Sequence, residues 1–434
     1  MKRLRVLLLG PDCNPHRKSI PFVTFSHAAA LSELHDVTLV ARSTVEDVLR
    51  RANASYRLEV VRMPVIERIY AWALRIFVGK NYSSHIKTAL GWPFHVAFEW
   101  RAWRQLKSRI MAGEFDVVIR LIPMSAVIPS PFAYFLRKGP IPFVIGPIQA
   151  ALPFHKSFSQ ADNQKQWIDV VRNVYRYMPF ARSTYRHAAA IIAGSSQAYA
   201  EFAAYGDKMF FVPEPGIGLS QCPGDSRIPE PGAKLELIFV GGLIPCKACD
   251  LGLRAAAPLL KDGLARFTVV GDGPERKRLE ELAKSLGVGE SVTFCGWLGH
   301  PEVLQRMRSA DVMVFPSVRD NGAGVVFEAL ANGAVPVVAD FGGPGDIVNS
   351  EVGYKVPLTN ESDFVSHMER ILREIAGNRE HLKGLRQRAM AYARERLTWE
   401  AKAQSTTQVL NWAVRRAPKP VLPPPKMLYL QAAA

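Results

Sequence analysis

The hydrophobic positions of this chain gather in short runs separated by segments of helical length. In the first half the runs are RVLLLG, DVTLVA, DVVIRLI, PFVIG and AAIIAG, at 5–10, 36–41, 116–122, 142–146 and 189–194. Runs that are apolar at nearly every position, rather than at alternate ones, are typical of strands buried on both faces, as in a parallel sheet. The first half therefore predicts a parallel sheet covered by helices on both faces.

The second half repeats this rhythm more regularly. Its strand-like runs lie at 235–241, 266–271, 291–296, 310–316, 334–340 and 353–357. Helical patterns such as PERKRLEELAKSLG, at 274–287, separate some of them, and further helical patterns follow at 361–377, 379–396 and 398–415. Alternating strands and helices are typical of doubly wound α/β folds. Each half is therefore predicted to be its own α/β domain.

The segment between the two halves differs in composition from both. Residues 213–234 are rich in proline and glycine and have no hydrophobic period, which is typical of a linker. We expect an N-terminal domain over 1–215, the linker over 216–234 and a C-terminal domain over 235–395. After a final helix, the prolines of PKPVLPPPK end regular structure and leave 417–434 as a tail.

Composition agrees with a globular protein of two domains. The 434 residues are 48% hydrophobic and 22% charged. Five cysteines do not make a disulfide framework, which favours a reducing, cytoplasmic compartment. The apolar run near the N-terminus is only about five residues long, too short for a signal peptide, and no run approaches the roughly 18 apolar residues of a membrane span. An integral membrane protein is not expected.

The net charge of +16 is concentrated near the N-terminus. Residues 1–110 contain 18 Lys+Arg against 8 Asp+Glu, which leaves +10 in that quarter of the chain. Within 65–110, tryptophans and basic residues are interleaved, a pattern that suits either helices packing their aromatic side chains on a core or a surface that binds an anionic membrane. Nucleic acid is not expected as a partner, because no zinc-finger spacing, aromatic RNA-binding strand or basic tail is present.

Glycine-rich loops follow the predicted strands of the second half. They lie at 240–247, 270–275, 294–300, 316–324 and 340–346. Ligands of open parallel sheets bind at the carboxyl ends of the strands, where glycine lets the backbone approach closely. One such loop indicates only a turn, and GAGVVF matches the dinucleotide motif G-x-G-x-x-G only in part. Five loops on one edge predict a ligand site.

The segment RDNGAGVVFEALANG, at 319–333, carries the most specific chemistry. A helix is predicted to begin near Gly324 and to end at Gly333. Glu328 lies one turn inside that helix, where it can accept from neutral hydroxyls, and Asp320 precedes the turn, free to face a second group of hydroxyls. The amides at the helix start form an expected anion site facing the cleft between the domains; they belong to Gly322, Ala323, Gly324 and Val325. This arrangement suits a diphosphate flanked by two sugars.

With these residues in view, the second half resembles the group 1 type of retaining glycosyltransferase family four. Asp320 and Glu328 have the spacing of its E-x7-E motif. FVGGLIPCKACDLGLRA, VVGDGPERKRLEELAKSLGV, VTFCGWLGHPEVLQRMRSADVMVFPS and GAVPVVADFGGPGDIV are similar to its other segments, in order over 235–357. GPIQAALPFH, at 146–155, more loosely resembles a branch that assembles bacterial exopolysaccharides. The resemblance implies the GT-B fold, in which two doubly wound Rossmann-like domains face across a cleft.

The resemblance also implies roles for individual residues. Lys247 matches the lysine that holds the donor diphosphate, Glu328 the acid that binds the nucleotide ribose, and Asp320 the acid that contacts the donor sugar. Family members retain anomeric configuration and need no metal or other cofactor, and the chain has no D-x-D pair. The strand-end backbone that matches the donor-binding loops comprises Gly241, Gly242, Gly273, Gly296, Trp297, Leu298, Gly322, Ala323, Gly324 and Val325.

The chain departs from the family pattern at several positions. Asp320 stands in place of the usual glutamate, and Gly242 in place of a phosphate-binding arginine. The loop GPDCNPHRKS lacks the family's paired glycines, and no histidine follows DVVIRLI near the expected reacting centre. Candidates for these acceptor-side functions are Arg17, Lys18, Arg120 and His155. Cys246 and Cys249 form one C-x-x-C, but no second pair has the ligand spacing of a zinc site.

The expected activity is transfer of a sugar, with retention, from a nucleotide-diphosphate sugar to a lipid-linked glycan acceptor in the synthesis of exopolysaccharide, lipopolysaccharide or another surface glycan. The basic segment would dock at the inner face of the cytoplasmic membrane, making the protein peripheral. As in relatives, the helix over 396–416 would cross back to the N-terminal domain. Alternatives are a nucleotide-sugar hydrolase, epimerase or phosphorylase of the same fold, and a catalytically impaired GT-B scaffold subunit.

Overall fold

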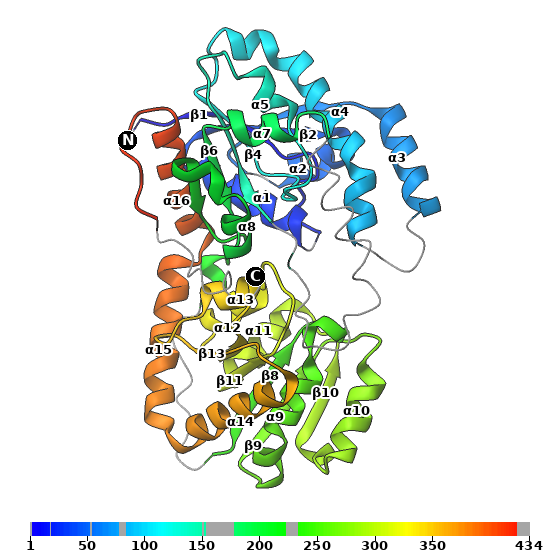
Figure 1. Ribbon diagram of the computed structural model, residues 1–434, viewed down its shortest axis with the longest axis vertical. Helices are drawn as coiled ribbons and strands as arrows, with labels where there is room; N and C mark the ends of the chain where they lie inside the picture. Colours follow the sequence, from blue (N-terminus) through cyan, green and yellow to red (C-terminus); the bar gives the residue numbers. More distant parts are fainter. Residues whose placement is uncertain are drawn as a thin grey trace. The chain divides into compact units, whose positions relative to one another are not determined.

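The computed structural model of the protein forms two compact units (Figure 1). The residues it describes are 2–17, 19–52, 54–77, 84–149, 152, 178–222 and 233–422; side chains are not described at 73–77 and 84–90. Of these residues, the first unit contains those up to 149 together with 178–214 and 399–422, and the second contains 152, 215–222 and 233–398.

The first unit is built on a seven-stranded parallel sheet of order β3-β2-β1-β4-β5-β6-β7. Two of its strands, β3 and β7, were not predicted. Both lie at the margins of the sheet, where β3 is only half-buried and β7 has three residues, so neither has a long apolar run. The strands are β1 (Arg5–Leu9), β2 (Asp36–Arg42), β3 (Arg57–Val61), β4 (Val117–Arg120), β5 (Phe143–Ile148), β6 (Ala190–Ala193) and β7 (Met209–Phe211).

Residues of β1 alternate between two hydrophobic cores. Leu7 and Leu9 pack into one core with Phe98, whereas Val6 and Leu8 pack into the other. Both faces of the sheet are therefore buried, which explains why the strands are apolar at successive positions. The helices that cover them are α1 (Ile20–Leu34), α2 (Glu46–Arg51), α3 (Pro64–Phe77), α4 (Ser84–Met111), α5 (Pro131–Phe135), α7 (Ala181–His187), α8 (Ser196–Glu201) and α16 (Trp399–Ala413).

The last helix, α16, packs in the first unit although the second unit precedes it in the chain. His27 of α1 lies 3.0 Å from the hydroxyl of Thr406, and His35 lies 2.8 Å from that of Thr407. Burial, and next the charge of Lys402, lowers the pKa of His27, so its imidazole is neutral within this contact. Two polar contacts and a shared hydrophobic core thus fix α16 against α1 (Figure 1).

The second unit contains a six-stranded parallel sheet of order β10-β9-β8-β11-β12-β13. All six strands were predicted, because each is a β-rich run that ends at or near a glycine or proline. The strands are β8 (Leu235–Val240), β9 (Ala265–Val270), β10 (Val292–Gly296), β11 (Val312–Phe315), β12 (Val335–Ala339) and β13 (Tyr354–Val356).

Helices of the second unit begin and end close to the predicted positions. Those predicted at 361–377 and 379–396 match the structure at both ends, because the side chains of Asn360 and Asn378 accept hydrogen bonds from the first-turn amides. The helices are α9 (Cys249–Lys261), α10 (Arg276–Ser285), α11 (His300–Ser309), α12 (Gly324–Ala331), α13 (Gly342–Ile347), α14 (Glu361–Gly377) and α15 (Arg379–Arg396). Among the described residues, none of the helices has the length and apolarity that crossing a membrane requires.

Candidate functional site

Backbone hydrogen bonds join the loops that follow β8, β9 and β10. The amide of Leu243 donates to the carbonyl of Asp272 at 3.0 Å, and the amide of Glu275 donates back to the carbonyl of Leu243 at 3.1 Å. The amide of Gly271 donates to the carbonyl of Gly296 at 2.8 Å. Three loops from different parts of the sequence therefore form one continuous surface at the carboxyl edge of the sheet.

Glycine is required for this close approach at two positions. A Cβ on Gly271, whose φ is +132°, would lie 1.9 Å from the carbonyl oxygen of Gly241. A Cβ on Gly273 would lie 2.4 Å from the carbonyl oxygen of Leu243. Any side chain at either position would push the loops apart, so these glycines shape the predicted site rather than only ending strands.

Asp320 accepts three hydrogen bonds from other residues, whereas it was expected to be free to bind hydroxyls. Its Oδ1 accepts from the amide of Ala323 at 3.0 Å, and its Oδ2 accepts from Nζ of Lys247. Its backbone carbonyl accepts from the amide of Gly343 at 2.9 Å, which joins the turn to the loop after β12. The Asp320 side chain thus stabilises the turn and neutralises the lysine.

The turn before α12 offers fewer amides to a ligand than the four that were predicted. Ala323 has a φ of +47° and its amide is bonded to Asp320, so this amide is not available to a ligand. The amides of Gly322, Gly324 and Val325 bond to no other residue that the structure describes. Because α12 begins at Gly324 as expected, its dipole still favours negative charge beside these three amides.

Lys247 is held between a carboxylate and an aromatic ring. It ends a 3-10 turn at Pro245–Lys247, and its Nζ lies 5.2 Å from the ring centroid of Phe315, a fully buried residue at the end of β11. The ion pair with Asp320 fixes its other side. The ammonium is thus positioned at the strand-end edge with about a fifth of the side chain exposed.

A second cation near Lys247 was not among the predicted site residues. Burial raises the pKa of the Cys246 thiol, while the charges of Lys247 and Arg319 lower it, so both cations lie near this sulfur. Arg319 is itself half-buried, and burial lowers its pKa. It directly precedes Asp320. Its place at the start of the segment 319–333 was the only feature of the sequence that could have indicated it as a site residue. Arg319 thus adds a second positive charge near Lys247.

Glu328 contacts a histidine that sequence reasoning also missed. Its Oε1 lies 2.8 Å from Nε2 of His300, the first residue of α11. His300 ends one of the five glycine loops, so the predicted strand-end edge contained it without assigning it a role. This contact holds one carboxylate oxygen of Glu328 and orients the side chain between α12 and α11.

Trp297 lies beside Gly242. The indole is 66% exposed, and its Cη2 lies 4.0 Å from where a Cβ on Gly242 would stand, which is an ordinary van der Waals contact. The structure therefore does not require a glycine at position 242. Gly296 provides the turn with a φ of +68°, and Leu298 packs against the hydrophobic core. The result is an exposed aromatic face over a glycine floor, a surface on which a planar base can stack.

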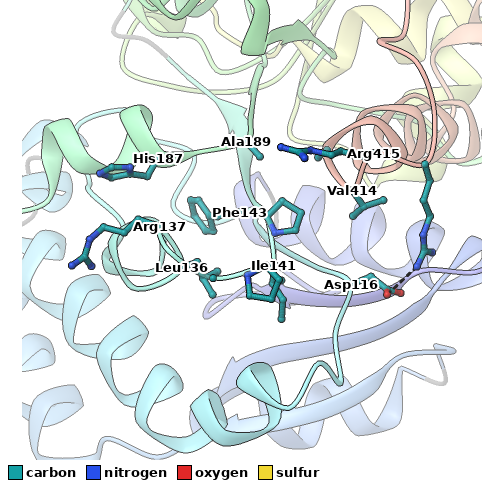
Figure 2. Close-up of a pocket in the computed structure, with 14 residues that line it drawn as sticks. Asp116, Leu136, Arg137, Ile141, Phe143, His187, Ala189, Val414 and Arg415 are labelled. Carbon is teal, nitrogen blue, oxygen red and sulfur yellow. Dashed lines mark hydrogen bonds and ion pairs between the residues drawn. The ribbon is translucent and has the colours of Figure 1, made fainter.

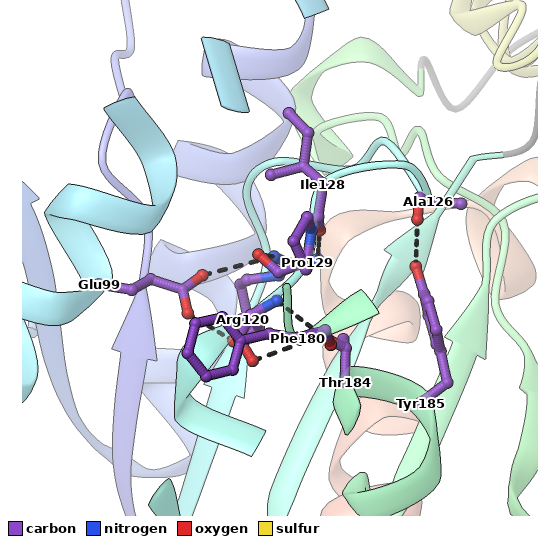
Figure 3. Close-up of polar contacts among 9 residues, drawn as sticks. Glu99, Arg120, Ala126, Ile128, Pro129, Phe180, Thr184 and Tyr185 are labelled. Carbon is purple, nitrogen blue, oxygen red and sulfur yellow. Dashed lines mark hydrogen bonds and ion pairs between the residues drawn. The ribbon is translucent and has the colours of Figure 1, made fainter. Parts of the chain in front are cut away.

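Arg120 is a correction to the predicted acceptor-side residues. Its side chain is fully buried at the end of β4, where it donates to the carbonyls of Ile128 and Pro129 at 3.0 and 3.2 Å and pairs with Glu99 at 3.4 Å (Figure 3). Because burial raises the pKa of Glu99 and the arginine lowers it, the two charges offset each other inside the unit. Arg120 therefore fixes a loop and offers nothing to an acceptor.

The remaining candidates are placed as follows. Arg17 is exposed in the loop between β1 and α1, while Lys18 and His155 lie outside the described residues. Cys249 is buried in α9, and burial raises the pKa of its thiol. Within the described ranges, no three His, Cys, Asp or Glu side chains gather in an arrangement that would hold a metal ion.

Comparison with known proteins finds similarity to glycosyltransferases in the part of the chain that contains this edge. Residues 225–396 match the family Glycosyl transferases group 1. An uncharacterized glycosyltransferase of Methanocaldococcus jannaschii is 31% identical over 179 residues, 41% of this chain and 45% of the relative. The D-inositol 3-phosphate glycosyltransferase of Nocardia farcinica is 32% identical over 203 residues, 43% of this chain and 44% of the relative. The chain thus matches about half the length of these curated relatives or less.

Solved structures resemble a larger part of the chain. HepE of Anabaena, solved in complex with UDP, has a TM-score of 0.59 at 15% identity and covers 94% of this chain and 100% of its own. The lipopolysaccharide outer core galactosyltransferase WaaB has a TM-score of 0.60 at 13% identity and covers 94% and 99%. Both match a chain with two parallel sheets of seven and six strands. Residues 225–396 are therefore similar to the glycosyl transferases group 1 family, and the chain has the GT-B fold.

Proposed function

We propose that the protein transfers a sugar from a nucleotide-diphosphate sugar to an acceptor hydroxyl, and that the carboxyl edge of the six-stranded sheet binds the donor. One observation carries the proposal: the pairs Lys247–Asp320 and His300–Glu328 lie in the loops and helix starts that follow the strands, at the same sheet edge as the exposed Trp297. Cations, an oriented carboxylate and an aromatic face are the groups that a diphosphate, a ribose and a base require.

The donor would occupy this edge in a defined order. Trp297 stacks on the base, and Glu328 accepts from the ribose hydroxyls through the oxygen that His300 leaves available. Lys247 and Arg319 hold the diphosphate together with the amides at the start of α12. Asp320 must then share Lys247 with the phosphate, while its Oδ1 stays bonded to the turn and its carboxylate faces the donor sugar.

The proposed reaction depends on positive charge that the protein holds beside the departing diphosphate. The bond between the anomeric carbon and the phosphate oxygen breaks, the acceptor oxygen bonds to that carbon on the face that the diphosphate vacates, and the acceptor proton leaves with the diphosphate. The configuration is thereby retained. Charge that develops on the diphosphate is stabilised by Lys247 and Arg319, without a metal ion. The nucleotide sugar is a co-substrate, and no other cofactor is required.

A panel of donors tests this proposal. A ligand that binds only the folded state stabilises it by about 2.7 kcal/mol at a hundredfold its Kd, which raises the Tm by several degrees. We expect the UDP-, GDP- or ADP-sugars of one base to raise the Tm of the full chain, and the matching nucleoside monophosphate, which lacks the second phosphate, to raise it less. If no nucleotide sugar raises the Tm at millimolar concentration, the donor site is wrongly assigned.

The acceptor side of the proposal rests on the outer face of α3. Val65, Ile69 and Trp72 follow one face of the helix at 60%, 59% and 60% exposure, whereas Ile66 and Tyr70 face the core. Helical residues three and four apart share a face, so the exposed residues form an apolar stripe. Exposed basic residues accompany it on the same helix and on α4; they include Arg68, Arg101, Arg104 and Lys107.

This combination supports a peripheral site at an anionic membrane surface, where a lipid-linked acceptor would be presented. The aromatic residues of this segment differ in position, because Trp103 packs on Phe132 and Phe135 inside the unit while Trp72 is exposed and, of the two, is the one that could contact a membrane. The role in surface-glycan synthesis and the location at the inner face of the cytoplasmic membrane form part of this proposal. WaaB, a lipopolysaccharide galactosyltransferase, supports it by likeness of fold.

Vesicle binding tests the apolar stripe. Replacing Ile69 and Trp72 together with serine should weaken binding to anionic vesicles at least tenfold, because each buried apolar side chain contributes about 1.5–3 kcal/mol. Leu264→Ser is the matched control, since Leu264 is 51% exposed on the second unit. Equal binding of the wild-type chain to neutral and anionic vesicles, or an unchanged affinity of the double variant, would rule the membrane surface out.

A further inference from the structure

The first unit contains a cavity of about 600 Å³ at the edge of the sheet opposite to the strand ends. Phe143, the first residue of β5, lies in its floor, and Asp116 and Ala189 directly precede β4 and β6. Leu136 and Ile141 complete an apolar floor. A volume of this size is typical of sites for small molecules. All strands of a parallel sheet begin on the same edge, so the cavity is separate from any site at the carboxyl ends.

Basic side chains flank this floor. Figure 2 shows Arg137 and His187 on one side of Phe143, and Val414 and Arg415 on the other. Burial lowers the pKa of His187, and the charges of Arg186, Arg137 and Lys208 lower it further. These three cations make the surroundings of His187 positive.

The one acidic residue in the lining does not balance this charge. Asp116 accepts from Arg416 at 3.0 Å and from Arg5, outside the lining, at 3.0 Å. Its carboxylate is thus shared by two arginines. The amide of Arg415 donates to the carbonyl of Trp412 at 2.9 Å. Its side chain has no hydrogen bond or ion pair with any other residue that the structure describes, so the guanidinium can bind an anion without breaking an existing contact.

The backbone of Arg415 is unusual for a residue with a side chain. Helix α16 ends in a turn in which the amide of Arg416 donates to the carbonyl of Asn411 at 2.8 Å, and Arg415 itself has a φ of +59°. Glycine normally occupies this left-handed position, because other residues are strained there by roughly 1 kcal/mol. An arginine in this position is consistent with a function of its side chain rather than with a structural need.

We propose that this cavity binds a phosphate-bearing small molecule or headgroup. The phosphate oxygens accept from the guanidinium of Arg415, whose planar fork matches phosphate geometry, and the apolar floor contacts the remainder of the ligand. Arg137, whose guanidinium donates to the carbonyl of Tyr134 at 2.7 Å and lies over the Tyr134 ring, adds positive charge on the other side of Phe143. Basic residues are also favoured at the C-terminal ends of helices such as α7 and α16, because the helix dipole is negative there. That preference explains why basic residues gather here, but it explains neither the cavity nor the left-handed conformation of Arg415.

The substitution Arg415→Gly separates the two explanations. Glycine relieves the backbone strain and removes the guanidinium, so the Tm should stay equal or rise while binding of inorganic pyrophosphate weakens about tenfold, as expected for the loss of one charge-assisted contact. Arg137→Gln should weaken it less, because Arg137 acts through its charge while its guanidinium stays on Tyr134. Arg370→Ala, at an exposed site on α14, removes the same charge far from the cavity and should change nothing.

The His187 ring signal, followed by NMR during a pH titration, reports on this cavity without interference from a donor site. Pyrophosphate should raise the pKa of His187 in the wild-type chain and much less in Arg415→Gly. Vesicles containing phosphatidic acid distinguish the ligand sources: a rise with vesicles alone indicates a lipid headgroup, and a rise with pyrophosphate alone indicates a soluble phosphate. If neither probe moves the pKa, or if Arg415→Gly responds as the wild type does, the cavity is not a phosphate site.

Discussion

Replacing Lys247 with alanine is expected to lower kcat for sugar transfer by about 10²- to 10³-fold, the loss typical when one preorganised group facing the developing charge is removed. The lysine is the cation best positioned by the fold, held between Asp320 and the buried Phe315 ring. Its removal also leaves the Asp320 carboxylate without its partner, so the donor diphosphate meets an uncompensated negative charge. Steady-state kinetics with the donor found in the panel measure both effects.

A double variant separates the two effects. Asp320→Asn removes the negative charge but keeps an oxygen that can accept from the Ala323 amide. Combining it with Lys247→Ala should recover much of the donor affinity and little of kcat. Lys284→Ala, at an exposed site on α10, is the control for an unrelated lysine. A wild-type kcat in Lys247→Ala would show that the lysine does not stabilise the leaving diphosphate.

Replacing Glu328 with glutamine should weaken nucleoside diphosphate binding by about 10- to 100-fold, because hydrogen bonds to a charged group contribute about 1.5–3 kcal/mol. The side chain is partly exposed and oriented by His300, so glutamine can keep the shape while losing the charge. Calorimetric titration measures the loss. Glu302→Gln, on the exposed face of α11, should bind as the wild type does.

The ribose itself provides the sharper control for Glu328. A 2′,3′-dideoxy nucleoside diphosphate lacks the hydroxyls that the carboxylate would accept from, so wild type and Glu328→Gln should bind it equally and weakly. His300→Ala should show the same pattern with a smaller loss. A Glu328→Gln variant that weakens both nucleotides alike would mean that the carboxylate only supports the loop. If neither Lys247 nor Glu328 affects donor binding, a scaffold subunit becomes the better account.

The fold was predictable to the extent that both faces of each sheet are buried. Val6 and Leu7 of β1 belong to different cores, so a run of apolar residues is the direct consequence of the architecture. The same rule fails at a sheet margin, where β3 has one buried residue among five and β7 is three residues long. The side chains of Asn360 and Asn378 cap α14 and α15 by bonding to amides only three residues later in the chain. Such short-range contacts are visible in the sequence, which is why the starts of these helices could be predicted.

The candidate site was predictable as an edge but not as a set of contacts. Lys247, Asp320 and Glu328 each follow the end of a predicted parallel strand, so the sequence places all three at one edge of the sheet, Glu328 in the first turns of a helix. Their pairing was not visible, because Lys247 and Asp320 are separated by 73 residues and His300 and Glu328 by 28. Arg120 was wrongly predicted for a related reason. An arginine at the end of a strand can be exposed to a ligand or buried against a carboxylate, and the sequence does not distinguish the two.

The central claim is transfer of sugar from a donor bound at the strand-end edge, and product analysis over time tests it most directly. The full chain is incubated with the donor that raises its Tm and with a lipid-linked acceptor, and glycosylated lipid and released nucleoside diphosphate are quantified together. We predict equal amounts of both products, with retained anomeric configuration, and the loss of both in Lys247→Ala. Release of nucleoside diphosphate and free sugar without glycosylated lipid, or undiminished transfer by Lys247→Ala, would contradict the account.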